Sequence, residues 1–436
     1  MTTIENKELK IETKLIHAGQ VLDEVSSRGV PLHRTSAYVF KDTKHAADLF
    51  GLKQLGNIYT RLMNPTTDVL EKRLAEIEGG AGALALASGT NAIFYSIINL
   101  AKSGDEIVSS SDLYGGSYTM FNNILPDFGI KTIFVDPSDP ENFRRAITPK
   151  TKAIFTETIG NPVLSVPDFE AISKIAKENK IPYIVDSTFT TPALFNPIEY
   201  DIDIICHSLT KWIGGHGTAI GGVVIDSGKF DWAQSTKHPL LTEPDASYHD
   251  IRYAHDLGDL NKLAYILRMR LVPLRNLGGC ISPDNSWIFL QGLETLHLRM
   301  QKHCENAQKV AEFLDKNDQV DWVNYPGLPT HKTHENAKKY LKKGFGGMVV
   351  FGIKGGRVAG EKFINNLNLI SHVANVGDAK SLAIHPASTT HSQLSTEQLN
   401  SGGIKPELIR LSIGIENVND IIDDINQALV KSGEDR

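Results

Sequence analysis

Short apolar runs alternate with amphipathic stretches over the first half of the chain. Apolar runs of strand length occupy residues 83–87, 106–110, 131–135, 152–157, 183–186, 201–205 and 221–225. Stretches with helical periodicity accompany them at residues 68–78, 92–98, 120–125 and 169–179. Strands that alternate with helices indicate a mostly parallel sheet with helices on its faces. The pattern therefore predicts an α/β fold for this part of the chain.

The last third has a different pattern, which predicts a smaller α+β domain. A long helix is expected over residues 287–314, then strands near 320–323, 346–352 and 408–413, and a closing helix at 418–430. Residues 229–283 are less regular and are interpreted as an insertion at the mouth of the first domain. Residues 1–60 are interpreted as an arm that docks on a neighbouring subunit. The predicted parts are therefore 1–60, 61–283 and 284–436.

Polar side chains follow several of the predicted strands at the point where each strand ends. Tyr114, Asn161 and Asp186 each follow or end an apolar run, and Ser208 to Lys211 follow another. In open α/β sheets, ligands bind at the carboxyl ends of the strands. We therefore expect these side chains to meet at one site.

Lys211 lies between a buried strand and a Gly-Gly turn. A lysine held out of bulk water has a lowered pKa and becomes a nucleophile, which suits a Schiff base. Asp186 emerges from a buried strand, where a carboxylate needs a cation or several hydrogen-bond donors. From these residues alone, a surface lysine and a turn-capping aspartate remain as alternatives.

Two segments have the character of anion sites. Ser88, Gly89 and Thr90 stand between a strand and a helix, where free backbone N–H groups and the helix dipole attract a phosphate. Tyr59 and Arg61 precede another helix on a segment that we interpret as extended, so a phenol and a guanidinium could reach one anion. Each segment alone is a weak signal, because tight turns and surface Tyr and Arg residues are common.

Other arginines lie in contexts that call for a partner. Arg410 is in the middle of a predicted strand, and a carboxylate is the natural partner of a guanidinium there. Arg268, Arg270 and Arg275 belong to a basic helical stretch in the insertion. The sequence leaves open whether that stretch is a solvated face or attracts an anionic ligand.

Composition narrows the classes of function. A formal net charge of −6 argues against a nucleic-acid or anionic-membrane surface. No apolar run approaches the ~18 residues that cross a bilayer, and the first residues lack a signal core, so neither a membrane span nor export is expected. The three cysteines have no CxxC spacing and the histidines lack a third ligand at a telling distance. We therefore expect a cytoplasmic protein with no disulfide framework and no metal site.

Motifs from residue 59 to residue 412 resemble those of the enzymes of cysteine and methionine metabolism that use pyridoxal phosphate (PLP), the cystathionine γ-synthase group. The motifs are residues 59–61, 64–66, 88–90, 114–116, 157–162, 186, 208–211 and 410–412. Residues 243–249, 375–382 and 384–393 are similar to those of O-acetylhomoserine sulfhydrylases in particular. Lyases of the group often carry a cysteine two residues after the stacking tyrosine, where this chain has Gly116.

The resemblance implies fold type I of the PLP-dependent transferases, the aspartate-aminotransferase-like fold, and it implies roles for particular residues. Lys211 would carry the cofactor as a Schiff base and later move protons. Asp186 would pair with the ring nitrogen, and Tyr114 would stack on the ring. Asn161 would bind the phenolic oxygen of the ring.

The resemblance also implies a site that spans two subunits. The phosphate would be held by Ser88, Gly89, Thr90, Ser208 and Thr210 and, from the neighbouring subunit, by Tyr59 and Arg61. Arg410 would bind the substrate carboxylate, with Asn375 and Tyr114 beside it. Tyr114 or Tyr59 would assist departure of the leaving group. A homotetramer built from two active dimers is the expected assembly.

The implied reaction is a γ-replacement in which O-acetyl-L-homoserine and sulfide, or a thiol, give L-homocysteine, or methionine, and acetate. Methionine γ-lyase and cystathionine γ-synthase stay open as sister activities, and a non-catalytic homologue is the alternative from another class. The residues leave open whether sulfur arrives as free sulfide, as a small thiol or on a carrier protein. They also leave open an acetyl, succinyl or phospho leaving group.

Overall fold

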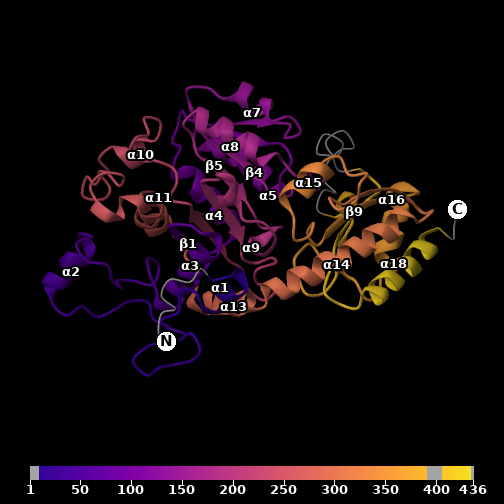
Figure 1. The fold of residues 1–436 in the computed structure, drawn as a ribbon, viewed down its shortest axis with the longest axis horizontal. Coiled ribbons are helices and arrows are strands. Elements are labelled where there is room, and N and C mark those ends of the chain that lie inside the picture. The colour runs from indigo at the N-terminus through magenta and orange to yellow at the C-terminus, as the bar shows by residue number, and fades with distance from the viewer. Residues whose placement is uncertain (1–8, 390–404, 434–436) are drawn as a thin grey trace.

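The computed structural model describes residues 9–389 and 405–433, which form two β-sheets (Figure 1). The larger sheet has the strand order β1-β7-β6-β5-β4-β2-β3. Its strands are β1 (Gly82–Leu86), β2 (Glu106–Ser110), β3 (Lys131–Val135), β4 (Thr151–Glu157), β5 (Tyr183–Asp186), β6 (Ile204–Ser208) and β7 (Gly222–Asp226). Neighbouring strands are parallel except where β7 pairs with β1 and β6. The predicted mostly parallel sheet is confirmed.

Helices cover both faces of the large sheet. One face packs against α1 (Ile11–His17), α3 (Pro65–Glu78), α8 (Phe169–Glu178) and α13 (Pro283–Glu294), and the other against α4 (Gly89–Ile98) and α11 (Ala264–Met269). Successive residues of a strand enter opposite cores, Ile204 with the α4 side and Ile205 with the α3 side. Strands buried on both faces read as continuous apolar runs, which is why the sequence pattern located them.

Helix α3 shows how local chemistry sets the boundaries of an element next to the site. The Asn64 side chain accepts a hydrogen bond from the Thr66 backbone N–H at 3.0 Å, and Pro65 occupies the first helical position. Gly79 ends the helix in the left-handed region, with φ of +76°. The helix start is thereby fixed directly after the turn that holds Tyr59 and Arg61.

The shorter helices are α2 (Thr43–Phe50), α5 (Gly115–Thr119), α6 (Leu125–Asp127), α7 (Glu141–Ala146), α9 (Thr191–Leu194), α10 (Pro239–Thr242) and α12 (Arg275–Leu277), with π-helical turns at Met120–Ile124 and Arg270–Leu274 and 3-10 turns at Pro197–Tyr200, Gly258–Leu263 and Pro386–Ser388.

The basic stretch of the insertion is part of the packed structure. Arg268 is buried and donates to the Asn99 side chain at 2.8 Å. Arg270 pairs with Glu71 at 2.5 Å. Neither expected reading of the stretch, a solvated face or an anion site, describes these two arginines.

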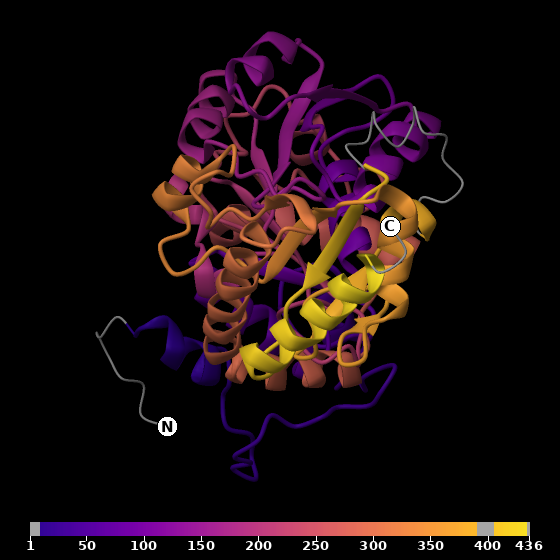
Figure 2. The ribbon, with the colours of Figure 1, turned by 90° about the vertical axis from the view of Figure 1, so that its right-hand side faces the viewer.

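The second sheet has the order β10-β11-β12-β9-β8 and carries the C-terminal helices (Figure 2). Its strands are β8 (Val320–Asn324), β9 (Met348–Ile353), β10 (Ser371–His372), β11 (Leu382–Ile384) and β12 (Leu408–Ser412). The accompanying helices are α14 (Leu296–Asp315), α15 (His334–Tyr340), α16 (Gly356–Asn365) and α18 (Val418–Gly433). The expected long helix is divided into α13 and α14. The predicted α+β architecture is confirmed.

The proposed boundary at residue 284 stays a prediction. Helix α13 (Pro283–Glu294) contains this boundary and packs against α3 of the large sheet, and the hydroxyl oxygens of Ser286 and Thr67 are 2.9 Å apart. The chain therefore crosses from one sheet to the other through α13 and α14 rather than at one residue.

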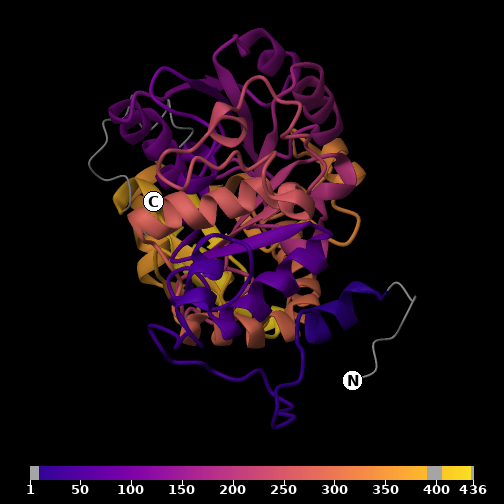
Figure 3. The ribbon, with the colours of Figure 1, turned by 90° about the vertical axis from the view of Figure 1, so that its left-hand side faces the viewer.

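The segment before α3 consists of a docked helix and a protruding part. Leu15 of α1 is fully buried against α3, whereas Val21, Val25 and Val39 are 82%, 81% and 99% exposed. Figures 2 and 3 show this indigo segment extending away from the rest of the chain. Exposed apolar side chains on a protruding segment support the predicted contact with a neighbouring subunit, which remains a prediction. In the described part of the chain, no helix is long and apolar enough to span a membrane.

Candidate active site

Lys211 lies one turn beyond the carboxyl end of β6 and contacts a loop of the second sheet. Its Nζ donates a hydrogen bond to Oδ1 of Asn375 at 2.6 Å. Burial lowers the pKa of Lys211, and the positive charge of Arg410 lowers it further. A neutral amine is the form that attacks a carbonyl and accepts a proton. The structure therefore supports the reactive-lysine interpretation over the surface-lysine alternative.

Two carboxylates end neighbouring strands beside this lysine. Glu157 of β4 and Asp186 of β5 are register partners. Burial raises the pKa of Asp186, and burial together with the charge of Asp186 raises the pKa of Glu157 well above its usual range. No ion pair to either group is formed within residues 9–389 and 405–433. Two desolvated carboxyl groups without a cation are suited to receive a positively charged ring N–H.

Backbone N–H groups position both carboxylates. The N–H of Thr188 donates to Asp186 Oδ1 at 2.9 Å, and the N–H of Tyr114 donates to Glu157 Oε1 at 2.7 Å. The hydroxyl of Thr188 accepts a hydrogen bond from the Ser208 N–H at 2.8 Å. Thr188 therefore joins the end of β5 to the end of β6. The capping alternative for Asp186 is therefore observed, and its pairing with a ring cation remains a prediction.

The start of α4 forms the anion-binding side of the site. The Ser88 hydroxyl caps the helix by accepting the Asn91 N–H at 3.1 Å, and Gly89 is the first helical residue, three residues before the predicted start. A Cβ placed on Gly89 would lie 2.5 Å from the Ser208 Cβ, so the glycine permits a close approach of α4 and β6. The Thr210 hydroxyl accepts the Gly221 N–H at 3.1 Å. Ser88, Gly89 and Ser208 are brought together as predicted.

Arg410 extends the site from the second sheet. It is the central residue of β12, between β11 and β9. Burial lowers the pKa of Arg410, and Tyr114 partly offsets this effect. In the described structure its guanidinium has no hydrogen-bond or ion-pair partner. A partly buried, unpaired guanidinium near Lys211 is suited to bind the carboxylate of a substrate.

Tyr114 and Asn161 complete the group at the strand ends. The Tyr114 side chain is 52% exposed, and a Cβ on Gly116 would lie 2.5 Å from its ring. A larger residue at position 116 would therefore displace the ring from this position. Asn161 is buried in the segment that follows β4, and its backbone N–H is among the groups that lower the pKa of Glu157.

The comparisons with known proteins agree with this geometry. A family model described as Cys/Met metabolism PLP-dependent enzyme matches residues 12–430. The chain belongs to this family. It is 53% identical over 430 residues to the O-acetyl-L-homoserine sulfhydrylase of Leptospira meyeri, covering 97% of each chain. It is 50% identical over 421 residues to the homocysteine synthase of Schizosaccharomyces pombe, covering 96% of this chain and 97% of the relative.

A solved structure gives the same result for the fold. A putative O-acetylhomoserine (thiol)-lyase from Campylobacter jejuni is 42% identical and superposes with a TM-score of 0.93, covering 97% of this chain and 100% of that one. That structure contains N'-pyridoxyl-lysine-5'-monophosphate. The chain has the fold type I architecture of PLP-dependent enzymes, as predicted, and PLP is the cofactor of its family.

Tyr59 and Arg61 have a different local structure from the one expected. Tyr59 forms an isolated bridge with Ala37, and the chain then turns, with the Leu62 N–H bonded to the Tyr59 carbonyl. The expected extended segment is therefore wrong. The Arg61 guanidinium lies 5.1 Å from the centre of the Tyr59 ring. Neither side chain has a hydrogen bond, ion pair or ring contact with Lys211, Asp186 or Ser208, and binding to a neighbouring subunit remains a prediction.

Sequence reasoning assigned no role to Glu157 and Thr188, which the structure places next to Asp186. Glu157 ends the strand next to the one that Asp186 ends, and Thr188 is the second residue after Asp186. For Glu157, the visible signal was a carboxylate that ends a buried strand. For Thr188, it was the position two residues after such a carboxylate, Asp186. The part of the expected sulfhydrylase-like segment beyond residue 389 lies outside the described residues.

Proposed function

We propose that this protein catalyses the γ-replacement of O-acetyl-L-homoserine by sulfide, which yields L-homocysteine and acetate. The observation that carries the proposal is the buried Lys211 amine, whose pKa is lowered by burial and by the charge of Arg410. Among the described residues, neither Arg410 nor Asp186, which ends the strand next to β6, has an ion-pair partner. The relatives named O-acetyl-L-homoserine sulfhydrylase and homocysteine synthase support the choice of reaction.

The residues fit PLP, and we assign its binding as follows. Lys211 holds the cofactor through a Schiff base, and Asp186 faces the ring nitrogen while Glu157 supports it. Tyr114 stacks on the ring, and Asn161 donates to its phenolic oxygen. The phosphate is held at the start of α4 and the end of β6 by Ser88, Gly89, Thr90, Ser208 and Thr210. When bound, PLP supplies the electron sink that stabilises negative charge on the substrate.

The chain's own groups then bind the substrate and move its protons. Arg410 and Asn375 bind the substrate carboxylate. Free Lys211 takes the proton from the α-carbon and then one from the β-carbon, because one flexible amine reaches both carbons, and both protons are returned after sulfide has bound. The electrons left at the β-carbon expel the leaving group from the γ-carbon. Acetate leaves from the γ-carbon, and sulfide forms the new bond at the same carbon. Tyr114 or Tyr59 assists the departure of acetate.

We also propose the oligomeric state and the cellular location of the enzyme. Tyr59 and Arg61 reach the phosphate of a neighbouring subunit, and the protruding apolar segment before α3 supports such a contact. We expect a homotetramer of two active dimers. The three cysteines form no disulfide, which supports a cytoplasmic enzyme.

A substrate panel tests the reaction. The holoenzyme is given O-acetyl-L-homoserine with sulfide, with methanethiol, with cysteine and with no nucleophile, and O-succinyl-L-homoserine replaces the acetyl ester in a second series. We expect homocysteine with sulfide, at a rate well above that of any other product. The Lys211→Arg variant should be inactive, because arginine keeps the charge but forms no Schiff base, and Lys342→Arg on the surface should be fully active.

Three results would contradict the proposal in different ways. Ammonia and an α-keto acid as the main products would indicate a γ-lyase. We do not expect them, because this chain has Gly116 at the position where lyases often carry a cysteine. Cystathionine as the main product would indicate a cystathionine γ-synthase. Protein that remains colourless after addition of PLP would indicate a non-catalytic homologue.

A further inference from the structure

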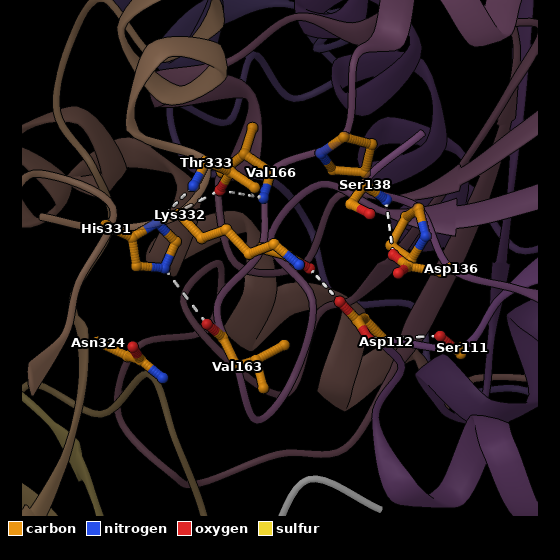
Figure 4. A pocket seen from close by; sticks show the side chains of 13 residues that line it. Ser111, Asp112, Asp136, Ser138, Val163, Val166, Asn324, His331, Lys332 and Thr333 are labelled. Carbon is orange, nitrogen blue, oxygen red and sulfur yellow. Dashed lines mark hydrogen bonds between the residues drawn. The ribbon is translucent and has the colours of Figure 1, made fainter. Parts of the chain in front are cut away.

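A cavity of about 370 Å³ lies beside the candidate active site and is separate from it (Figure 4). Its walls come from the segments that follow β2, β3 and β4 and from the segment before α15 of the second sheet. None of the residues assigned above to PLP or to the substrate lines it. Its volume is at the lower end of the range for small-molecule sites in proteins.

Charges of opposite sign face each other across this cavity. Lys332 extends from the segment before α15 toward Asp112, and Asp136 lies beyond (Figure 4). Hydrogen bonds from Ser138 are the main cause of the lowered pKa of Asp136, and the charge of Lys332 adds to it, so Lys332 and Asp136 are near each other. No ion pair within 4.0 Å is formed by Lys332 among the residues that the structure describes. The ammonium and the carboxylates are therefore separated by a space that a ligand could occupy.

Each carboxylate of the cavity accepts a hydrogen bond from the protein itself. Asp112 accepts the Ser165 hydroxyl at 2.6 Å, and Asp136 accepts the Ser138 N–H at 2.8 Å. Burial lowers the pKa of His331, so this residue is neutral and Lys332 supplies the positive charge. The carboxylates keep free acceptor positions, because each oxygen can accept two hydrogen bonds.

We infer that this cavity binds a free L-α-amino acid with an apolar side chain. Lys332 binds the α-carboxylate, and Asp112 and Asp136 bind the α-ammonium group. Val163, which is partly exposed, forms the apolar part of the wall, against which the side chain packs. The inference does not depend on the proposed reaction, because it uses none of the residues of that reaction.

The position of the cavity connects it to the active site. Asp112 is two residues from Tyr114 along the chain. A Cβ on Gly160 would lie 2.9 Å from the Asp112 Cβ, so Asp112 also packs against the residue that precedes Asn161. A ligand held by Asp112 therefore contacts the segment that positions two of the candidate ring-binding residues.

The test uses holoenzyme that has been reduced with borohydride. Reduction fixes PLP to Lys211 through a stable amine, so an amino acid can no longer displace this lysine, and binding at a second site can be measured separately. Equilibrium dialysis with radiolabelled L-leucine and L-methionine should show one site per chain. Lys332→Ala should weaken binding at least about tenfold, the loss expected for a charged hydrogen bond. Asp136→Asn should weaken it as well.

Two controls separate this site from weaker explanations. Lys343→Ala removes an exposed lysine of the same domain and should leave binding unchanged. Butyrate and butylamine each carry one of the two charges and should compete poorly with the amino acid. The inference is overturned if the reduced holoenzyme binds neither amino acid at millimolar concentration. It is also overturned if Lys332→Ala binds like the unmodified sequence, or if butyrate competes as well as leucine.

Discussion

Asn375→Asp changes the charge beside the proposed catalytic lysine and keeps nearly the same shape. In the structure, Asn375 Oδ1 is 2.6 Å from Lys211 Nζ. A carboxylate at this position would favour the charged form of the amine. Two unit charges 4 Å apart attract by about 4 kcal/mol at an effective dielectric constant of about 20. Asn375 is partly exposed, so we expect about half of this, which is a roughly 30-fold change in the ratio of charged to neutral amine.

The expected result is a change in the pH dependence of turnover. The pH profile of kcat reports groups in the enzyme–substrate complex, where Lys211 is free. Asn375→Asp should lower kcat up to about 30-fold at neutral pH and recover much of it at alkaline pH, because the amine must lose its proton before it can accept one. Asn375→Ala should lower activity with no displacement of the acidic limb. Homocysteine production, measured at saturating substrate from acid to alkaline pH, gives the profile.

Asn419 provides the matched control for Asn375. Asn419→Asp makes the same change on an exposed face of α18 and should leave the profile unchanged. Profiles of Asn375→Asp and the unmodified sequence that superpose would refute the view that Asn375 contacts Lys211 during turnover. Equal losses in the Asp and Ala variants at every pH would point to a purely structural role for this loop.

Other perturbations test other parts of the molecule. Gly89→Ala should lose PLP, because its Cβ would collide with β6, whereas Gly29→Ala has no atom within 4 Å and should retain the cofactor absorbance. Arg410→Lys should lower kcat/KM about 10- to 150-fold, since a bidentate charged pair is lost, and unchanged kinetics would exclude carboxylate binding there. Burial raises the pKa of Asp203 and Asp226 to about 7. These pKa values are above those of the same groups in the unfolded chain. The stability that the protonated groups contribute at acid pH is therefore lost as pH rises from about 4 to 7. Asp203→Asn, which retains an acceptor for the backbone, should therefore show a smaller fall in unfolding temperature between pH 5 and pH 8, and an equal fall would contradict this assignment.

The large sheet could be predicted because its strands are buried on both faces. Residues 183–186 and 201–205 are apolar runs, and the rule that ligands meet the carboxyl ends of strands then predicted Asp186 and Lys211 at one site. Gly89 and Ser208 are far apart in sequence, and the resemblance to a known family is what predicted that they share one site. Topology therefore predicted the residues at the strand ends, and the resemblance added the phosphate-binding residues and Arg410.

Contacts made by long side chains could not be predicted in the same way. Arg270 lies on a basic stretch whose pattern fits a solvated face, but its partner Glu71 is 199 residues away in sequence. The contact of Lys211 with Asn375 spans 164 residues and depends on how the two sheets dock. Sequence periodicity indicates which face of an element is buried, but it does not specify the partner across a domain seam.

Contacts between the two sheets restrict the backbone around Lys211, in addition to its position just after β6. The Arg299 guanidinium, from α14, donates to the carbonyl oxygens of Trp212 and Ile213 at 2.7 and 3.0 Å, directly after Lys211. On the other side, a Cβ on Gly377 would lie 2.8 Å from the Lys211 carbonyl carbon, so the loop that carries Asn375 packs directly on the lysine backbone. A short turn fixed from both sides has little freedom to reorient. The second sheet therefore does more than supply Arg410, the proposed carboxylate-binding group, because the elements packed with it also hold the backbone that carries the Lys211 side chain.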